Sequence, residues 1–323
     1  MAGKKGRFAA FAEYAAIRAA CGVVNALPYS VAAAAARAAA SVAFRVFRFK
    51  RRRTLERIRS VFPDIAPRRA REIAVQSLSN VFLAAVEMMR APSLDRRWMD
   101  RHVRDGTMYK ERLKSYADEG RGVVVMVPHS GNWYMAAWSM AKYGLPLFAI
   151  AARQRNPYID AWMKRQYGDI DVVERGSART LAAIKARLEE GRVFAILPDL
   201  RARDPDVEVD FLGGKANVSH AGAMFAVKCG CPVVVAAMRR EGGVHVFDHL
   251  ATIRPDPAAT DRKVEAVRIT REVMAHLDRA VRRNPGDWFW YNKRWILEPP
   301  SRKRPVRHGE STQPLLRRAN NFF

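Results

Sequence analysis

The sequence predicts an α/β protein with a mostly parallel central sheet flanked by helices, and with N-terminal helices that associate with a membrane. From residue 121 onward, short apolar runs of strand length alternate with helix-like segments, the pattern of a parallel sheet covered on both faces. Residues 8–46 are rich in Ala, Val and Phe and are followed by a dense group of arginines. With 323 residues, 49% of them hydrophobic, the chain can bury a core of this size.

The first region, residues 1–58, is predicted to form the membrane-associated helices and a basic segment. Its longest uncharged run, Ala19 to Ala36, contains Pro28, so two helices broken near this proline fit better than one spanning helix. An apolar helix followed by a basic cluster is typical of a segment on an anionic cytoplasmic leaflet. The alternative is a helical hairpin packed on the protein, with its arginines in water. The cluster comprises Arg45, Arg48, Lys50, Arg51, Arg52, Arg53, Arg57 and Arg59.

The second region, residues 59–300, is predicted to form the main α/β domain, and residues 301–323 a basic tail. Residues 54–120 read as helical, with apolar residues at helical spacing over 68–91. The predicted strands are Val123–Val127, Leu145–Ala151, Ile170–Val173, Val193–Leu197, Pro232–Met238 and His245–Ile253. The helices predicted between and after them are Trp133–Tyr143, 157–167, Arg175–Glu190, a helix capped by Ser219 that runs to Lys228, and 260–283.

The net charge of the chain indicates which classes of molecule it can bind. Lys and Arg number 57 against 32 Asp and Glu, a net charge of +25, which favours an anionic partner unless the arginines are only a solvated surface. A nucleic-acid-binding function would rest on charge alone, because no helix-turn-helix, zinc or RNA-binding aromatic motif occurs in the sequence. No nucleic acid is therefore expected, and lipid or an acidic protein is favoured. Three cysteines make no disulfide framework, which fits a cytosol-facing protein.

Two predicted strands end in the same way. The run VVVMVPH stops at His129, and the run VFAILPD stops at Asp199. Because parallel strands place their carboxyl ends at one edge of the sheet, a His–carboxylate pair can form there. Such a pair fixes the imidazole tautomer and stabilises the imidazolium after proton uptake. The alternative is that His129 is a hydrogen-bonded turn residue and Asp199 caps a loop.

Other chemistries find little support in the sequence. No serine lies in a G-x-S-x-G elbow, and Ser130 follows the histidine directly. The histidines are scattered without a metal-binding spacing, and FLGGK at 211–215 is not a phosphate-binding loop. The sequence thus predicts neither a metal nor a cofactor. It favours direct attack by a substrate hydroxyl that His129 deprotonates, which needs no protein nucleophile.

Several segments, in order along the chain, resemble the bacterial lipid A biosynthesis lauroyl/myristoyl acyltransferase family, which includes the phosphatidylinositol mannoside acyltransferases. VPHSGNWYMAA resembles the HxGNW motif of that family, and RQRNPYIDAWM its Arg-x-Asn-Pro segment. VFAILPDLR resembles its strand ending in Pro-Asp, VEVDFLGGK its F-x-G loop, and WFWYNKRW its closing aromatic segment. The likeness covers roughly residues 8–300, and five motifs in order are specific.

The resemblance implies an enzyme that moves a fatty acyl chain from an acyl carrier protein or coenzyme A thioester to a hydroxyl of a lipid A precursor or another glycolipid. It implies a lipid-linked sugar acceptor, an anionic membrane surface as partner, and a location at the cytoplasmic face of the inner membrane. His129 matches the general base of the family. The family motif is usually H-x4-(D/E), whereas this chain has Tyr134 at the acidic position. A catalytically degenerate lipid-binding relative is therefore the alternative.

Three carboxylates are candidates for the missing acid. Asp199 matches a second acidic position of the family and ranks first, followed by Glu208 and then Asp210. The arginines near the strand ends could bind the phosphate of a carrier or of a lipid headgroup, or pair with neighbours such as Asp160. Arg294 could be an interfacial anchor or a core-closing ion pair. The residues predicted to bind substrate or shape its site are Asn132, Trp133, Tyr134, Arg153, Arg155 and Arg201.

Overall fold

The computed structural model describes residues 6–105, 109–118, 120, 122–176 and 179–297, so the predicted tail over 301–323 lies outside the described residues. The described helices are α1 (Arg7–Ala26), α2 (Tyr29–Arg45), α3 (Arg51–Val61), α4 (Pro67–Arg90), the 3₁₀ turn η1 (Ala91–Ser93), α5 (Arg96–His102), α6 (Tyr109–Asp118), α7 (Trp133–Lys142), α8 (Pro157–Gln166), α9 (Thr180–Glu189), α10 (Ala221–Cys229) and α11 (Arg262–Arg283). The described strands are β1 (Val103–Asp105), β2 (Val123–Met126), β3 (Leu147–Ala151), β4 (Asp171–Glu174), β5 (Val193–Ile196), β6 (Val207–Phe211), β7 (Gly214–Val218), β8 (Val233–Glu241) and β9 (Val244–Ile253).

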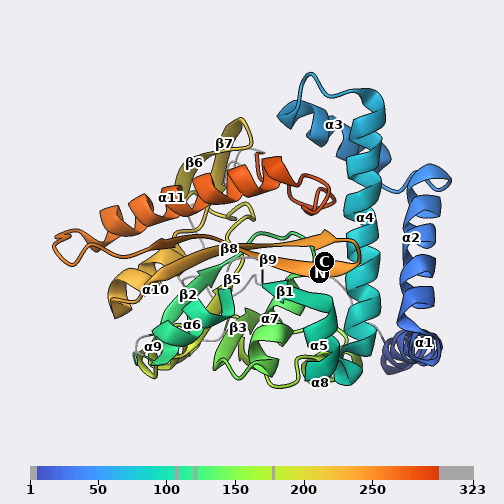
Figure 1. Cartoon of the computed structure of the whole chain (residues 1–323), viewed down its shortest axis with the longest axis horizontal. Helices are drawn as coiled ribbons and strands as arrows, with labels where there is room; N and C mark the ends of the chain where they lie inside the picture. The colour runs from blue at the N-terminus through green and yellow to red at the C-terminus, as the bar shows by residue number, and fades with distance from the viewer. Residues whose placement is uncertain (1–5, 106–108, 119, 121, 177–178, 298–323) are drawn as a thin grey trace, which may run out of the picture.

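Seven of these strands form one sheet in the order β1-β9-β8-β2-β5-β3-β4 (Figure 1). The five strands from β8 to β4 run parallel, which confirms the predicted mostly parallel sheet. Strand β9 is antiparallel to β8, because only Gly242 and Gly243 separate them. Both glycines have positive φ, as a tight hairpin turn requires. β6 and β7 form a separate antiparallel pair in a stretch interpreted from sequence as a loop.

The sheet separates two hydrophobic cores, and β2 contributes to both. Val124 and Met126 pack with residues of α9, α10 and α11 on one face. Val123, Val125 and Val127 pack with residues of α5, α6, α7 and α8 on the other. Because all five side chains are nearly inaccessible to solvent, β2 is fixed from both sides. Whatever follows its carboxyl end is therefore held on a rigid element.

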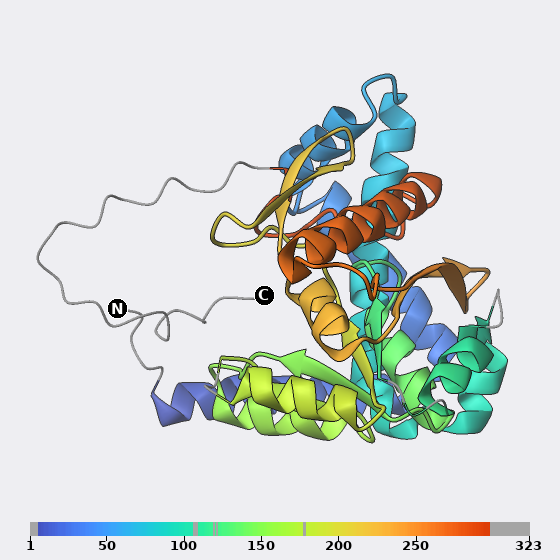
Figure 2. The ribbon, with the colours of Figure 1, turned by 90° about the vertical axis from the view of Figure 1, so that its left-hand side faces the viewer.

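The N-terminal helices break at Leu27 and Pro28, as the sequence predicts, and α2 runs alongside α4 while α1 lies across one end of both (Figures 1 and 2). Small side chains allow this close approach, since the buried alanines of α2 face Leu83 and Val86 of α4. No helix in the described ranges combines the length and the apolar character that crossing a bilayer requires.

Part of the predicted basic cluster faces the protein rather than a membrane. The Arg57 guanidinium is buried, donates to the carbonyls of Trp290 and Asn292, and stacks on Trp295. Lys50 donates to the carbonyl of Tyr291. These cations satisfy main-chain oxygens of the aromatic C-terminal segment, for which arginine is well suited. Lys50 and Arg57 therefore contact the protein itself, whereas the two interpretations of the cluster placed its cations at lipid or in water.

Two helix starts also differ from the sequence predictions. The helix expected from Arg175 begins at Thr180. In α10 the N-cap is His220 rather than Ser219, although the Ser219 hydroxyl still accepts a hydrogen bond from the Ala221 amide. Both shifts are at element boundaries and leave the sheet order unaffected.

Candidate active site

His129 and Asp199 meet at the carboxyl edge of the sheet, where neighbouring strands β2 and β5 end. The Asp199 Oδ1 atom lies 2.7 Å from His129 Nδ1, and Asp199 Oδ2 accepts a second 2.7 Å hydrogen bond from the His129 amide. The His129 side chain is 17% exposed and that of Asp199 is 1% exposed. Because Nδ1 is engaged by the carboxylate, Nε2 on the opposite side of the ring is the nitrogen that can take a proton from a substrate.

A tryptophan from the C-terminal segment donates a further hydrogen bond to the Asp199 carboxylate. Trp288 Nε1 donates a 2.8 Å hydrogen bond to Asp199 Oδ2. Burial by itself raises the pKa of the Asp199 carboxyl. The attraction of His129 and the hydrogen bonds from His129 and Trp288 outweigh that effect and hold the pKa below its usual range. Asp199 is therefore a carboxylate at neutral pH.

The turn that carries His129 is clamped by main-chain hydrogen bonds. The Gly131 amide donates to the Asp287 carbonyl, and the Phe289 amide donates to the His129 carbonyl, both at 2.9 Å. Gly131 has a φ of +58°, and a Cβ there would lie 2.8 Å from the Met238 carbonyl oxygen. Only glycine fits both the conformation and the close approach to β8.

The residues after this turn shape the start of α7. The Asn132 side-chain oxygen accepts hydrogen bonds from the amides of Tyr134 and Met135 and so caps the helix. The Trp133 ring lies edge-on to His129, with centroids 4.9 Å apart. The Tyr134 ring stacks on Trp138 at 5.9 Å, and burial raises the pKa of its phenol. Tyr134 is thus a neutral, packed side chain, and the carboxylate at His129 Nδ1 comes from Asp199.

The two lower-ranked acids lie on the β6–β7 pair. Glu208 is on the exposed side of β6 opposite Asn217. Asp210 is 85% exposed in its side chain and pairs with Lys215 at 2.6 Å. The geometry thus brings Asp199, and neither of these two acids, into hydrogen-bond contact with His129.

The predicted arginines follow the carboxyl ends of β3 and β5. Arg153 and Arg155 are exposed after β3, and the Asp160 carboxylate pairs directly with Lys164 at 3.0 Å. Arg201 is half-buried, two residues beyond Asp199. Burial and the positive charges of three neighbouring arginines lower the pKa of the Arg294 guanidinium. Those neighbours are Arg203, Arg201 and Arg175.

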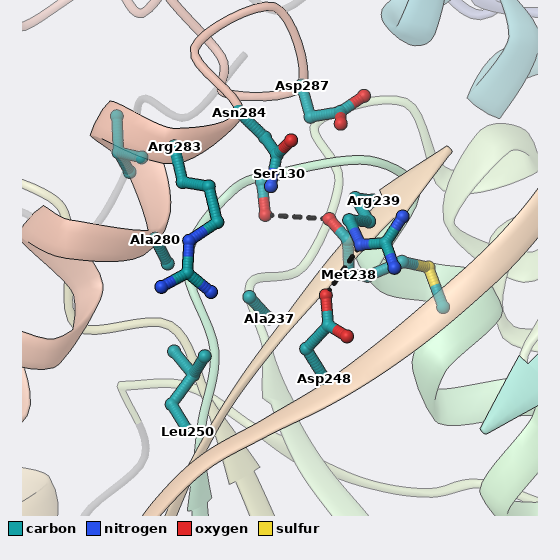
Figure 3. Close-up of a pocket in the computed structure, with 11 residues that line it drawn as sticks. Ser130, Ala237, Met238, Arg239, Asp248, Leu250, Ala280, Arg283, Asn284 and Asp287 are labelled. Carbon is teal, nitrogen blue, oxygen red and sulfur yellow. Dashed lines mark hydrogen bonds and ion pairs between the residues drawn. The ribbon is translucent and has the colours of Figure 1, made fainter. Parts of the chain in front are cut away.

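A small pocket lies behind the turn (Figure 3). Ser130 lines it and donates a 2.9 Å hydrogen bond to the Met238 carbonyl, while Asp287 lines another side. Neither His129 nor Asp199 is among its lining residues. The pocket therefore belongs to the packing of the turn against β8 and α11 rather than to the face where Nε2 would meet a substrate.

Comparison with known proteins shows the family of the chain. The model of the family described as "Bacterial lipid A biosynthesis acyltransferase" matches residues 4–296. The chain belongs to this acyltransferase family. It is similar to the phosphatidylinositol mannoside acyltransferase of Mycobacterium tuberculosis, 25% identical over 258 residues that cover 76% of this chain and 77% of the relative. It is also similar to that of Mycolicibacterium smegmatis, 26% identical over 230 residues that cover 68% and 70%.

Two residues of this acyltransferase that sequence reasoning missed hold the site together. Trp288 was read only as part of an aromatic segment, although it contacts Asp199. Glu87 was not singled out, although it is a fully buried acid that bonds to Asn132. A signal for Glu87 was present, since it lies among buried positions of α4 such as Leu83 and Ala84. A charge on the buried face of a helix calls for partners.

Proposed function

We propose that the protein is a membrane-associated O-acyltransferase that moves a fatty acyl chain from an acyl carrier protein or coenzyme A thioester to a hydroxyl of a glycolipid, with His129 as general base. The observation that carries the proposal is the buried Asp199 carboxylate on Nδ1 of a partly exposed histidine. This pairing fixes the tautomer that carries its proton on Nδ1, which leaves Nε2 as the nitrogen that can accept a proton from a substrate.

In the proposed reaction, the acceptor hydroxyl donates a hydrogen bond to His129 Nε2. As its oxygen attacks the thioester carbonyl, the imidazole takes the proton, and Asp199 stabilises the resulting imidazolium. The tetrahedral intermediate then collapses, the C–S bond breaks, and the imidazolium returns the proton to the thiolate. The products are an ester and a free thiol. No acyl group is attached to the protein at any stage.

The acceptor and the donor both carry negative charge in this proposal. The relatives are named for phosphatidylinositol mannoside, which favours a mannosylated phospholipid over a lipid A precursor as acceptor. The arginines after the strand ends, among them Arg153, Arg155 and Arg201, would bind the phosphates of donor or acceptor. The guanidinium groups of Arg175, Arg201 and Arg203 raise the positive potential at Arg294, which supports an anionic ligand.

The N-terminal helices would hold the enzyme at the cytoplasmic face of the inner membrane. In the described part of the chain, eight of the ten exposed large hydrophobic side chains lie between Phe8 and Phe49. Phe8 is 85% exposed and Phe47 is 77% exposed, and exposed arginines such as Arg48 lie beside them. Apolar side chains flanked by cations suit an anionic interface.

Acyl transfer tests the catalytic proposal. The purified protein is given a long-chain acyl-CoA and a phosphatidylinositol mannoside in detergent, and thiol release and acylated lipid are both measured. His129→Ala should lose most of the rate, because general-base catalysis contributes on the order of 10²–10⁴. Equal, measurable rates for His129→Ala and wild type would refute His129 as the base, whereas no transfer by the wild type would favour the alternative of a catalytically degenerate lipid-binding relative.

Vesicle binding tests the membrane proposal. The wild type should cosediment with anionic vesicles, and the double variant Phe8→Ser/Phe47→Ser should bind more weakly by roughly tenfold or more, since two buried aromatic side chains would be lost to the lipid. The matched control is Leu181→Ser, an exposed apolar residue outside this region. Equal binding by all three proteins would contradict the assignment of this surface.

A further inference from the structure

Glu87 is a buried carboxylate at the meeting point of four structural elements. Its side chain is fully inaccessible to solvent and lies near the C-terminal end of α4. Tyr29 of α2 donates to Oε1 at 2.7 Å, and Arg240 of β8 donates to both oxygens at 2.9 and 2.6 Å. His245 Nε2 of β9 lies 3.1 Å from Oε1. The positive charge of Arg240 alone would balance the negative charge of Glu87, so the other hydrogen bonds to this carboxylate need a further explanation.

The remaining donor comes from the turn that carries His129. Asn132 Nδ2 donates to Glu87 Oε2 at 2.6 Å, while Asn132 Oδ1 caps α7. An ionised carboxylate can accept hydrogen bonds but cannot donate them, so the NH₂ group of Asn132 must face Glu87. The oxygen must then face the helix, and the asparagine is locked three residues after His129.

We propose that Glu87 is a positioning residue for the transfer reaction: its carboxylate orients the Asn132 amide and thereby holds the turn that places His129 against Asp199. The inference rests on the proposed role of His129 as base. The inference goes beyond that role, because it assigns a task to a side chain that is remote from the reacting atoms and bonded to none of them.

Glu87 can affect the position of His129 because the turn that carries His129 is held by hydrogen bonds on more than one side. Its hydrogen bonds to Asp287 and Phe289 hold the main chain on one side. The Glu87–Asn132 bond holds it from the side of α4. A catalytic group displaced by about 1 Å can lose on the order of 10²-fold in rate. Removal of the lock should therefore lower kcat and leave KM nearly unchanged.

Glu87→Gln alone leaves the buried Arg240 without its carboxylate, so it reports folding as well as positioning. Asn132→Ser avoids this. It leaves the carboxylate of Glu87 paired with Arg240 and keeps a good helix cap, but removes the amide that reaches Glu87. Glu72→Gln, an exposed acid of α4 that pairs with Arg68 and Arg69, is the matched control.

Transfer kinetics with acyl-CoA and phosphatidylinositol mannoside are measured for each folded variant, together with the proton resonance of the His129 Nδ1 site in the absence of substrate. We expect Asn132→Ser to lose roughly tenfold to 100-fold in kcat and to shift that resonance. Glu72→Gln should match wild type.

Unchanged kcat and resonance in Asn132→Ser would overturn the inference. Failure of the proposed function looks different: wild type and His129→Ala would then transfer at the same rate, whatever the state of the turn. The resonance still reports whether Glu87 positions His129 in that case.

Discussion

Asp199→Asn is a sharp test of the proposed mechanism, because the hydrogen bonds dictate how the new amide must lie. The His129 amide and Trp288 Nε1 both donate to Oδ2. Neither donor can change its role, so the asparagine oxygen must occupy the Oδ2 position. The NH₂ group is then placed at Oδ1, facing His129 Nδ1. An NH₂ donor there makes Nδ1 the acceptor and moves the imidazole proton to Nε2, where it blocks the base.

The size of the effect follows from this wrong tautomer together with the lost negative charge. In a triad where the same substitution traps the same tautomer, kcat falls by about 10⁴. We expect a loss on the order of 10³–10⁴, which corresponds to about 4–5.5 kcal/mol in the activation free energy. The free energy of unfolding should fall far less, by about 1.5–3 kcal/mol, since one charged hydrogen bond is weakened while the shape is kept.

The assay is acyl transfer under saturating substrate, accompanied by urea unfolding of the same protein. Asp169→Asn, an exposed acid that pairs with Lys142, is the control for the chemical change and should retain wild-type kcat. A folded Asp199→Asn protein with more than about a tenth of the wild-type kcat would refute the tautomer argument.

Three further predictions concern the surroundings of the site. Gly131→Ala should lower the free energy of unfolding by about 1–3 kcal/mol in urea titration, because its Cβ would meet the Met238 carbonyl at positive φ; unchanged stability would be inconsistent with the close approach. Burial lowers the pKa of His245, so the unfolded chain binds a proton more readily and stability should fall as the pH drops below about 6.5. His245→Gln should remove that dependence between pH 7.5 and 5.5, and an identical slope in both proteins would count against it. Tyr134→Phe should keep kcat, and a loss of roughly tenfold or more would show that the hydroxyl takes part in the chemistry.

Much of the sheet could be predicted because its strands are short apolar runs with clear ends. The contact of His129 with Asp199 followed from the same logic, since each comes after a proline at the end of a parallel strand. The β6–β7 pair was missed although Val207, Val209 and Phe211 alternate with polar residues. That period of two was outweighed by the glycines of the F-x-G motif, which favoured a loop.

Other parts could not be predicted, because their partners are main-chain atoms or distant side chains. Arg57 looks like any member of a basic cluster until the carbonyls of Trp290 and Asn292 are placed beside it. Trp288 reaches Asp199 across 89 positions of sequence. A single sequence contains no periodicity that records such pairs, since they arise only when helices and loops have packed around the sheet.

The bonds from residues 287–289 to the turn at His129 also constrain the order in which the protein can assemble. The strands β2 and β5 can pair once residue 196 has left the ribosome. The turn is not clamped, and Asp199 lacks its indole donor, until Trp288 and Phe289 arrive. Contacts of such long sequence separation form late and slowly. A nascent chain of this acyltransferase should therefore contain the paired strands β2 and β5 before it contains the clamped His129–Asp199 pair.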